Sequence, residues 1–371
     1  MGESLTQIQT SPADVLASFG PGVGLCGDIH PFANGKKDTP LAERLVGNPL
    51  LMAPMAGVTD SAYRMMARAG GADVAYSEMV SCAGLHYGGN GSWELTECAE
   101  GEPDLAVQLF GTKPELFREA AEGVAERLGT RLVLIDINMA CPVPKVTKKG
   151  EGAALMETPE LAETLVSACV EALAPYGVPV TVKIRRGRYD GRELAPEFAR
   201  RMEAAGAQAV AVHGRYATQF YHGEADWDTV RRVAGAVKIP VIGSGDVRDA
   251  HEAARMLSET GARAVMVARG SYGNPWVFNQ AKDILAGKEP FAPGLVTRIE
   301  AFECHMRLLA ATGAHLKRGR SLANWYLKGM PEAAFWRGEA NKCITLEEFL
   351  RVSARIKEAM AEAEDHGFEI R

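Results

Sequence analysis

Residues 132–184 hold the pattern that decides the fold: an apolar run, LVLIDIN at 132–138, is followed by an amphipathic stretch, PELAETLVSACVEAL at 159–173, and by a second apolar run, VPVTVKI at 178–184. Both runs are apolar at nearly every position, which is typical of parallel strands that are covered on both faces. A helix is the usual crossover between two such strands. The stretch therefore predicts a strand, a helix and a second, parallel strand.

The same alternation continues in both directions along the chain. Eight short runs are expected to form strands; they are PLLMAP (49–54), DVAYSE (73–78), LAVQLF (105–110), LVLIDIN (132–138), VPVTVKI (178–184), AVAVHG (209–214), IPVIGS (239–244) and AVMVAR (264–269). Eight strand and helix units within about 240 residues match the size of a (β/α)8 TIM barrel, an α/β fold. An open doubly wound sheet is the main alternative, and the regular eightfold repeat favours the closed barrel.

The flanking regions differ from this pattern. Residues 1–47 are rich in Gly and Pro without a regular period, so we expect an irregular N-terminal extension. The GxGxxG pattern within it, at residues 22–27, lacks a preceding strand and a following helix, so we interpret it as a loop and not a dinucleotide site. After about residue 290 the periodicity becomes helical. The predicted organisation is an extension at 1–47, a barrel domain at 48–288 and a helical domain at 289–371.

Composition limits the class of protein. The chain has 371 residues, 47% hydrophobic and 24% charged, as in folded soluble proteins. Without a long apolar run or a secretory pattern in residues 1–10, we expect a cytoplasmic protein that does not bind membranes. We also expect a monomer. Seven scattered cysteines without a CxxC spacing favour reduced thiols over disulfides or a metal site.

Glycines follow the last two predicted strands, where barrels often bind phosphate. Gly243 ends the seventh run together with Ser244, Gly245 follows it, and Gly270 follows the eighth run, next to Arg269. Glycine lets backbone NH groups approach an anion, and a following helix adds its dipole. These loops therefore predict a phosphate site, with ordinary tight turns as the alternative.

Donors at other strand ends indicate what the phosphate belongs to. Gln108, Lys183 and residues 54–56 supply amide, ammonium and backbone donors, which suit a flat heterocycle with carbonyl and ring-nitrogen acceptors. Flavin mononucleotide (FMN) has that makeup, and a cation near its N1 and C2 carbonyl edge stabilises the reduced ring. Taken alone, Lys183 is better explained as a strand-end lysine that extends to solvent.

Cys141 is the cysteine best placed for chemistry. It follows the fourth run, and Lys145, Lys148 and Lys149 come after it, surroundings that leave a thiol reactive. Cys169, within the amphipathic stretch, is instead expected in the core. Because the chain has neither a Ser/His/Asp arrangement nor an HExxH motif, the roles open to Cys141 are nucleophile and proton donor.

The motifs at the strand ends, in this order, resemble those of the flavin-dependent tRNA-dihydrouridine synthases. They are APMAGVTD (53–60), VQLFG (107–111), INMACPVPKV (137–146), KIRRG (183–187), VHGR (212–215), GSGD (243–246) and ARGSYGNPW (268–276). The resemblance covers residues 48–357 and is most specific in the motif that carries Cys141. It implies an enzyme that reduces the C5=C6 bond of a uridine in tRNA, with FMN that NADPH has reduced.

The resemblance also implies roles for single residues. The FMN site would be lined by Pro54, Met55, Ala56, Gln108, Lys183, His213, Ser244, Gly245, Asp246, Ala268 and Arg269. Cys141 would be the general acid. Asn138 and Lys145 would face the uracil, and Arg215 is also expected to bind the substrate. Two positions depart from the family, since Ser244 replaces the usual Asn and Ala268 the usual Gly, so FMN binding is expected to be weaker but not lost.

A basic region lies within the predicted helical domain. Residues 301–357 carry ten basic and five acidic residues, although the whole chain has a net charge of −6. Lys317, Arg318 and Arg320 precede Trp325 and Tyr326, and this mixture of cations and aromatic faces suits RNA. We expect the three basic residues to bind tRNA, whereas the aromatic pair is equally well explained as an anchor of the helical core.

Two other functions fit parts of the pattern. A flavin barrel that acts on a free pyrimidine or enone would leave the basic helical region unexplained. A noncatalytic tRNA-binding protein would need no flavin, so flavin binding separates it from either enzyme.

Overall fold

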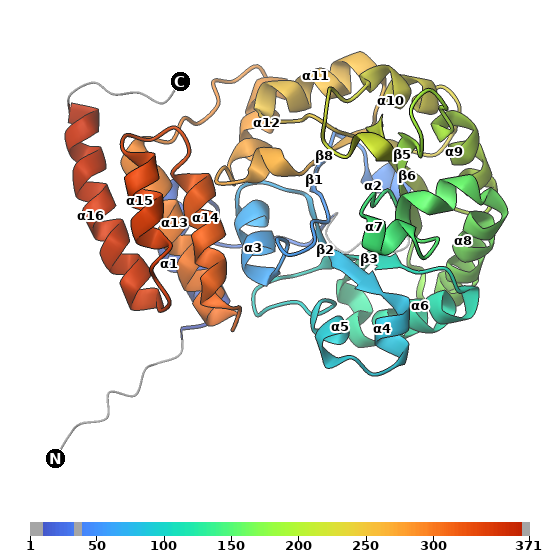
Figure 1. Cartoon of the computed structure of the whole chain (residues 1–371), viewed down its shortest axis with the longest axis horizontal. Helices are drawn as coiled ribbons and strands as arrows, with labels where there is room; N and C mark the ends of the chain where they lie inside the picture. Colours follow the sequence, from blue (N-terminus) through green and yellow to red (C-terminus); the bar gives the residue numbers. More distant parts are fainter. Residues whose placement is uncertain (1–9, 33–38, 366–371) are drawn as a thin grey trace.

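The computed structural model describes residues 10–32 and 39–365, which form a barrel with a group of helices at its side (Figure 1). The barrel strands are β1 (Leu50–Met52), β2 (Val74–Ser81), β3 (Leu105–Phe110), β4 (Leu132–Met139), β5 (Val180–Gly187), β6 (Ala209–Tyr216), β7 (Val241–Ser244) and β8 (Ala264–Val267). They are all parallel and pair in sequence order, and β1 pairs with β8, with Leu51 opposite Met266. The predicted TIM barrel is confirmed, and the open-sheet alternative is wrong.

Helices follow each of the eight strands along the chain. They are α3 (Ser61–Ala69), α4 (Cys82–His86), α5 (Asn90–Glu94), α6 (Pro114–Leu128), α7 (Pro144–Thr147), α8 (Pro159–Leu173), α9 (Ala195–Ala204), α10 (Trp227–Ala234), α11 (Ala250–Thr260) and α12 (Val277–Leu285). The side chains of Asp60, Asp226 and Asp249 accept hydrogen bonds from first-turn NH groups and so start α3, α10 and α11. Short polar side chains thus fix where these three helices start after the strand-end loops.

Side chains fill the inside of the barrel. Leu51, Tyr76 and Met266 pack there with alanines from neighbouring strands. Leu41, from the short helix α2 (Leu41–Arg44) that precedes β1, belongs to the same buried cluster. These side chains close the end of the barrel at which the strands begin. A ligand can therefore reach the strands from the opposite end, where their carboxyl ends lie.

The helical domain packs directly on the barrel. It consists of α13 (Leu295–Ala311), α14 (Gly319–Tyr326), α15 (Ala333–Ala340) and α16 (Leu346–Asp365). The sequence predicts α13, α14 and α16, whereas α15 is an addition whose helical pattern is weakened by Gly338. Phe302 and Leu309 of α13 lie in one buried cluster with Met65 and Trp276 of the barrel, so the two parts share a continuous core.

Part of the N-terminal extension is helical, which corrects the prediction of an irregular segment. Helix α1 (Pro12–Phe19) lies beside α13 and buries Val15 and Leu16 in the same cluster (Figure 1). The chain then turns toward the barrel, where Trp276 Nε1 donates a hydrogen bond to Val23 O at 2.8 Å. The described part of the extension thus bridges the helical domain and the barrel.

The remainder of the predicted extension, residues 1–9 and 33–38, lies outside the described residues. Within the described part, the GxGxxG segment follows α1 as a 3-10 turn (Pro21–Val23) and a loop, as the sequence predicts. Among the described residues, no helix combines the length and the apolar composition needed to cross a membrane.

Replacing Leu16 by Ala tests whether α1 stabilises the protein. Leu16 is 2% exposed, and such a truncation in a packed core costs about 2–5 kcal/mol. We expect a loss of about 2–3 kcal/mol in the free energy of unfolding, measured by urea denaturation. Ser18→Ala, at an exposed position of the same helix, is the control, with an expected change below about 0.5 kcal/mol. Equal losses in the two variants would contradict a packing role for α1.

Candidate active site

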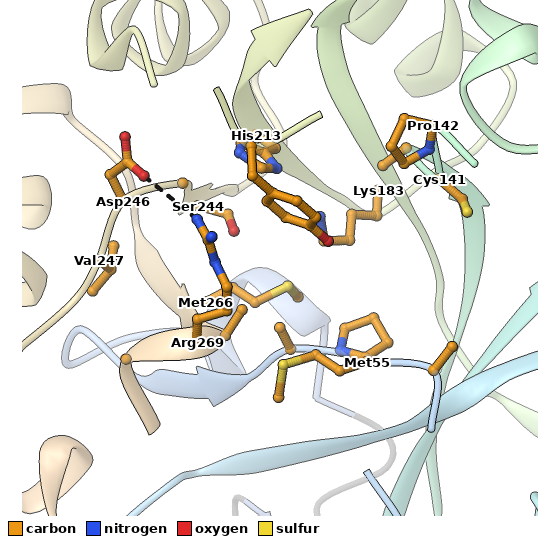
Figure 2. Close-up of a pocket in the computed structure, with 18 of the residues that line it drawn as sticks. Met55, Cys141, Pro142, Lys183, His213, Ser244, Asp246, Val247, Met266 and Arg269 are labelled. Carbon is orange, nitrogen blue, oxygen red and sulfur yellow. Dashed lines mark ion pairs between the residues drawn. The ribbon is translucent and has the colours of Figure 1, made fainter. Parts of the chain in front are cut away.

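A cavity of about 690 Å³ opens at the carboxyl ends of the barrel strands (Figure 2). Its volume lies within the range of small-molecule sites, about 300–1,000 Å³. Thirteen of the predicted site residues line it, the proposed acid Cys141 among them: Pro54, Met55, Ala56, Gln108, Asn138, Cys141, Lys183, His213, Ser244, Gly245, Asp246, Ala268 and Arg269. The barrel thus brings together residues that are up to 215 positions apart in the chain.

The loops after β7 and β8 form one end of the cavity, marked in Figure 2 by Asp246 and Arg269. Gly245 has a φ of 105°, and a Cβ atom there would lie 2.7 Å from the ring of His213. At Gly270, a Cβ atom would lie 2.4 Å from the carbonyl oxygen of Val247. Both positions therefore require glycine. Their backbone, together with the half-exposed Arg269 side chain, can approach an anion closely.

Arg215 supports this end of the cavity from behind. Its guanidinium is 2% exposed and donates to Asp246 Oδ2 at 2.7 Å and to Gly223 O at 2.6 Å. The same Asp246 oxygen accepts from the NH of Ala225 at 2.7 Å. These bonds join the loop after β6 to the loop after β7. Arg215 does not line the cavity, and its donors are used within the protein, so its contact with the substrate stays a prediction.

A chain of buried hydrogen bonds runs from the cavity wall to the cysteine loop. Gln108 Nε2 donates to Asp136 Oδ2 at 2.7 Å, and Asn138 Nδ2 donates to Gln108 Oε1 at 2.7 Å. Asn138 Oδ1 in turn accepts from the NH of Cys141 at 2.9 Å. Burial raises the pKa of Asp136 to about 6. Asp136 is not among the residues predicted from the sequence, although an aspartate within the apolar run LVLIDIN is itself a signal of a buried polar role.

Lys183 and His213 bring titratable groups into the cavity (Figure 2). Burial, with a smaller contribution from Arg185, lowers the pKa of Lys183 to about 8. Burial, and then the charges of Arg185 and Lys183, hold the pKa of His213 well below its usual value, so its imidazole is neutral at pH 7. Because Lys183 lines the cavity, the interpretation of a lysine that extends to solvent is wrong.

Cys141 lies at the other end of the cavity from Asp246 and Arg269 (Figure 2). The residue is half-buried, and burial raises the pKa of its thiol although Arg185 and Lys183 act in the opposite direction. The thiol is therefore protonated at neutral pH and able to donate a proton. Arg185 holds the loop in place, since its Nε donates to Ala140 O at 2.8 Å.

Several cavity residues were not singled out from the sequence. Arg185 is one of them, although it lies in the quoted strand-end motif KIRRG. The ring of Tyr221 contacts the guanidinium of Arg269, with 4.4 Å between the ring centroid and Cζ. From the helical domain, Trp325 reaches the cavity and stacks on Tyr272 at 4.0 Å between ring centroids. Of the aromatic pair in the sequence, Trp325 thus borders the site, whereas Tyr326 is a core residue with 2% exposure.

The predicted basic cluster separates into three environments. Lys317 is exposed. Arg318 forms ion pairs with Asp60 and Glu78 of the barrel. Arg320 donates through Nε and Nη2 to the carbonyl oxygen of Cys343, at 3.2 and 3.1 Å. Of the three residues predicted to bind tRNA, both arginines are thus bonded within the protein, and Lys317 is exposed.

Lys145 lies on α7, is exposed and does not line the cavity, and its contact with the uracil stays a prediction. Lys148 and Lys149 follow it and are exposed as well. The three ammonium groups lie on the rim next to the cysteine loop.

The sequence matches the family model of the dihydrouridine synthases over residues 51–363. The "Probable tRNA-dihydrouridine synthase" of Rickettsia conorii is 36% identical over 297 residues, 79% of this chain and 88% of that protein. The tRNA-dihydrouridine synthase B of Xanthomonas axonopodis pv. citri is 36% identical over 301 residues, with 80% and 89% covered. Histamine dehydrogenase from Rhizobium sp. 4-9 is a solved structure with 15% identity and a TM-score of 0.46, covering 71% of this chain and 49% of that one.

The family match at residues 51–363 includes both the barrel and the helical domain. The chain belongs to the dihydrouridine synthase family.

Proposed function

We propose that this protein reduces the C5=C6 bond of a uridine in tRNA to 5,6-dihydrouridine, with FMN as its bound cofactor and NADPH as the reductant. The observation that supports this best is a single cavity with a thiol of raised pKa at one end and two glycine turns with an arginine at the other. Family membership supports the same reaction class. The cytoplasmic location and the monomeric state stay predictions from the sequence.

The residues of the cavity fit FMN in their chemistry. Gly245, Gly270 and Arg269 would hold the phosphate, because glycine backbone and a guanidinium suit a dianion. Lys183 and Gln108 would face the polar edge of the ring, where a cation favours the reduced form. When bound, reduced FMN supplies two electrons and one of the two hydrogen atoms that are added to the uracil.

Cys141 would supply the second hydrogen, as a proton to C5 of the uracil. The raised pKa of its thiol suits this task, since the group must carry its proton until the base arrives. Asn138 would hold the cysteine loop through its bond to the Cys141 NH. The residue is half-buried, so the thiolate left after the transfer can regain a proton from solvent.

The two departures from the family pattern are compatible with this site. Ser244 and Ala268 both line the cavity, so the backbone groups of both can lie close to a bound cofactor. We therefore propose that both positions act mainly through their backbone and that the binding of FMN is weakened but retained.

The reaction of the purified protein with FMN, NADPH and tRNA tests the proposed function. We expect the protein to bind FMN, NADPH to reduce it, and tRNA lacking dihydrouridine to reoxidise it without oxygen. Mass spectrometry is expected to find two added hydrogen atoms in one uridine. Free uridine and simple enones are the comparison substrates. A protein that binds no flavin, or that reduces enones as readily as tRNA, would contradict the proposal.

Cys141→Ala tests the proton donor. We expect FMN content and NADPH-driven reduction to be retained, and reoxidation by tRNA to slow about 10²–10⁴-fold, the usual contribution of a general acid. The rates are measured separately by stopped-flow absorbance of the flavin. Cys26→Ala, which removes an exposed thiol elsewhere, is the control and is expected to react like the wild type. Wild-type reoxidation in Cys141→Ala would exclude the assigned role.

The pH dependence of alkylation tests the protonation state of the same thiol. A free cysteine titrates near pH 8.5, and burial raises the pKa of Cys141, so its reactive thiolate form appears only at higher pH. We expect iodoacetamide to label Cys141 with a midpoint above about pH 8.5, read by mass spectrometry of its peptide. A midpoint near neutral pH would mean that the residue is a thiolate and a poor acid.

Charge reversal on the rim tests the approach of tRNA. We expect Lys145→Glu, Lys148→Glu and Lys149→Glu together to weaken tRNA binding. The slope of log K against log salt concentration is expected to fall by the equivalent of up to about three phosphate contacts. The measurement is a titration of labelled tRNA at several salt concentrations. Lys238→Glu, exposed near the start of β7 at the opposite end of the barrel, is the control. Equal binding by the triple variant and the control would move the RNA surface elsewhere.

A further inference from the structure

Arg318 of the helical domain reaches the barrel close to the cofactor cavity. Its Nη1 donates to Asp60 Oδ2 at 2.5 Å, and its Nη2 donates to Glu78 Oε1 at 3.3 Å. The side chains of Asp60 and Glu78 are 14% and 11% exposed, so both carboxylates are largely removed from water. One guanidinium thus joins two barrel carboxylates to the start of α14.

The same two carboxylates hold the turn that follows β1. Glu78 Oε2 accepts a hydrogen bond from the NH of Gly57 at 2.6 Å. Asp60 Oδ1 accepts from the NH of Tyr63 at 2.9 Å, in the first turn of α3. Gly57 directly follows residues 54–56, which line the cavity. The two carboxylates therefore set the shape of the turn from its outer side, away from the cavity.

We propose that Arg318 is a positioning residue of the cofactor pocket and not an RNA contact, an inference that rests on the proposed FMN site. Without a cation between them, the carboxylates of Asp60 and Glu78 repel each other in surroundings that screen charge poorly. Each carboxylate then lowers its electrostatic free energy by turning toward water. That movement weakens the bond from Gly57 NH to Glu78 and frees the turn that borders the cavity.

The guanidinium group is suited to this task. Its planar fork can bond two carboxylates at once, whereas a lysine ammonium is a compact point charge. Beside Arg318, the helical domain contacts the barrel through aromatic rings. The ring centroids of Trp325 in α14 and Tyr63 in α3 are 6.2 Å apart, and Trp325 also stacks on Tyr272, which follows β8. The helical domain therefore meets the barrel at two borders of the cavity, and Arg318 is the charged part of that contact.

Lys317 provides a natural comparison. It precedes Arg318 and belongs to the same basic cluster in the sequence, but its side chain is exposed. A phosphate could attract Arg318 only by separating it from Asp60 and Glu78, whereas Lys317 is open to solvent. Adjacent residues of like charge thus have different tasks, which makes them a matched pair for experiment.

The test compares R318Q and K317Q in the full-length protein. In R318Q we expect the Kd for FMN to rise about tenfold, which corresponds to about 1.4 kcal/mol of binding free energy. The Kd is measured by quenching of FMN fluorescence. The affinity of the FMN-saturated variant for tRNA is expected to stay unchanged. In K317Q we expect the opposite, with unchanged FMN affinity and weaker tRNA binding at low salt. R318K, which keeps the charge but not the fork, is expected to bind FMN with intermediate affinity.

Amide hydrogen exchange of the apoprotein gives a readout that needs no cofactor. We expect faster exchange at residues 55–58 in R318Q but not in K317Q, while the barrel strands stay protected and show that the variant is folded. The double variant R318Q/E78Q removes the repulsion and is expected to regain part of the FMN affinity. This rescue also covers the case in which R318Q alone is poorly folded.

Two results would overturn the inference: R318Q with the FMN affinity of the wild type, or R318Q/E78Q with no recovery relative to R318Q. Loss of tRNA affinity in R318Q with normal FMN binding would return Arg318 to the RNA surface. A wild-type protein that binds no FMN is a separate outcome, because it would contradict the proposed function before the variants are compared.

Discussion

Closure of the sheet between β1 and β8 is the constraint on which the rest of the structure depends. In a closed parallel barrel all carboxyl ends of the strands meet at one rim, so residues such as Pro54, Cys141 and Arg269 border the same cavity. The opposite end is filled by side chains that include Leu41 of α2. Ligand access is thereby directed to the rim that carries the polar residues, and the helical domain needs only to border this rim to take part in the chemistry.

Burial shifts the pKa values of the titratable groups in the cavity so that each neutral form is favoured. It lowers the pKa values of Lys183 and His213 and raises that of the Cys141 thiol, so each group is shifted toward its neutral form. A neutral thiol beside a lysine that still carries much of its charge at pH 7 is an arrangement for proton donation, whereas a nucleophilic cysteine needs the thiolate. The burial of the thiol thus favours one of the two roles that the sequence leaves open for Cys141.

The sequence predicts the barrel well because each strand is a local apolar run, and it predicts the cavity residues because barrel geometry places every strand end at one rim. What it misses depends on contacts between distant residues. Lys317, Arg318 and Arg320 look equivalent in the sequence, but Arg318 meets carboxylates about 240 residues away in the chain. In the sequence, nothing distinguishes Arg215 from an arginine that binds substrate, but in the structure its guanidinium donates to Asp246. Helix α1 escapes detection because it is short and lies among glycines and prolines, and its stability comes from packing on α13.

The crystal structure of the FMN complex tests the central claim most directly, because that claim concerns where the ring, the phosphate and one sulfur atom lie. The account predicts the phosphate at Gly245, Gly270 and Arg269, and Cys141 Sγ across the face of the ring at about 7 Å, twice the usual contact distance between stacked atoms, which leaves room for one base. A ring bound outside this cavity, or a Cys141 sulfur that points away from the ring into the protein interior, would contradict it.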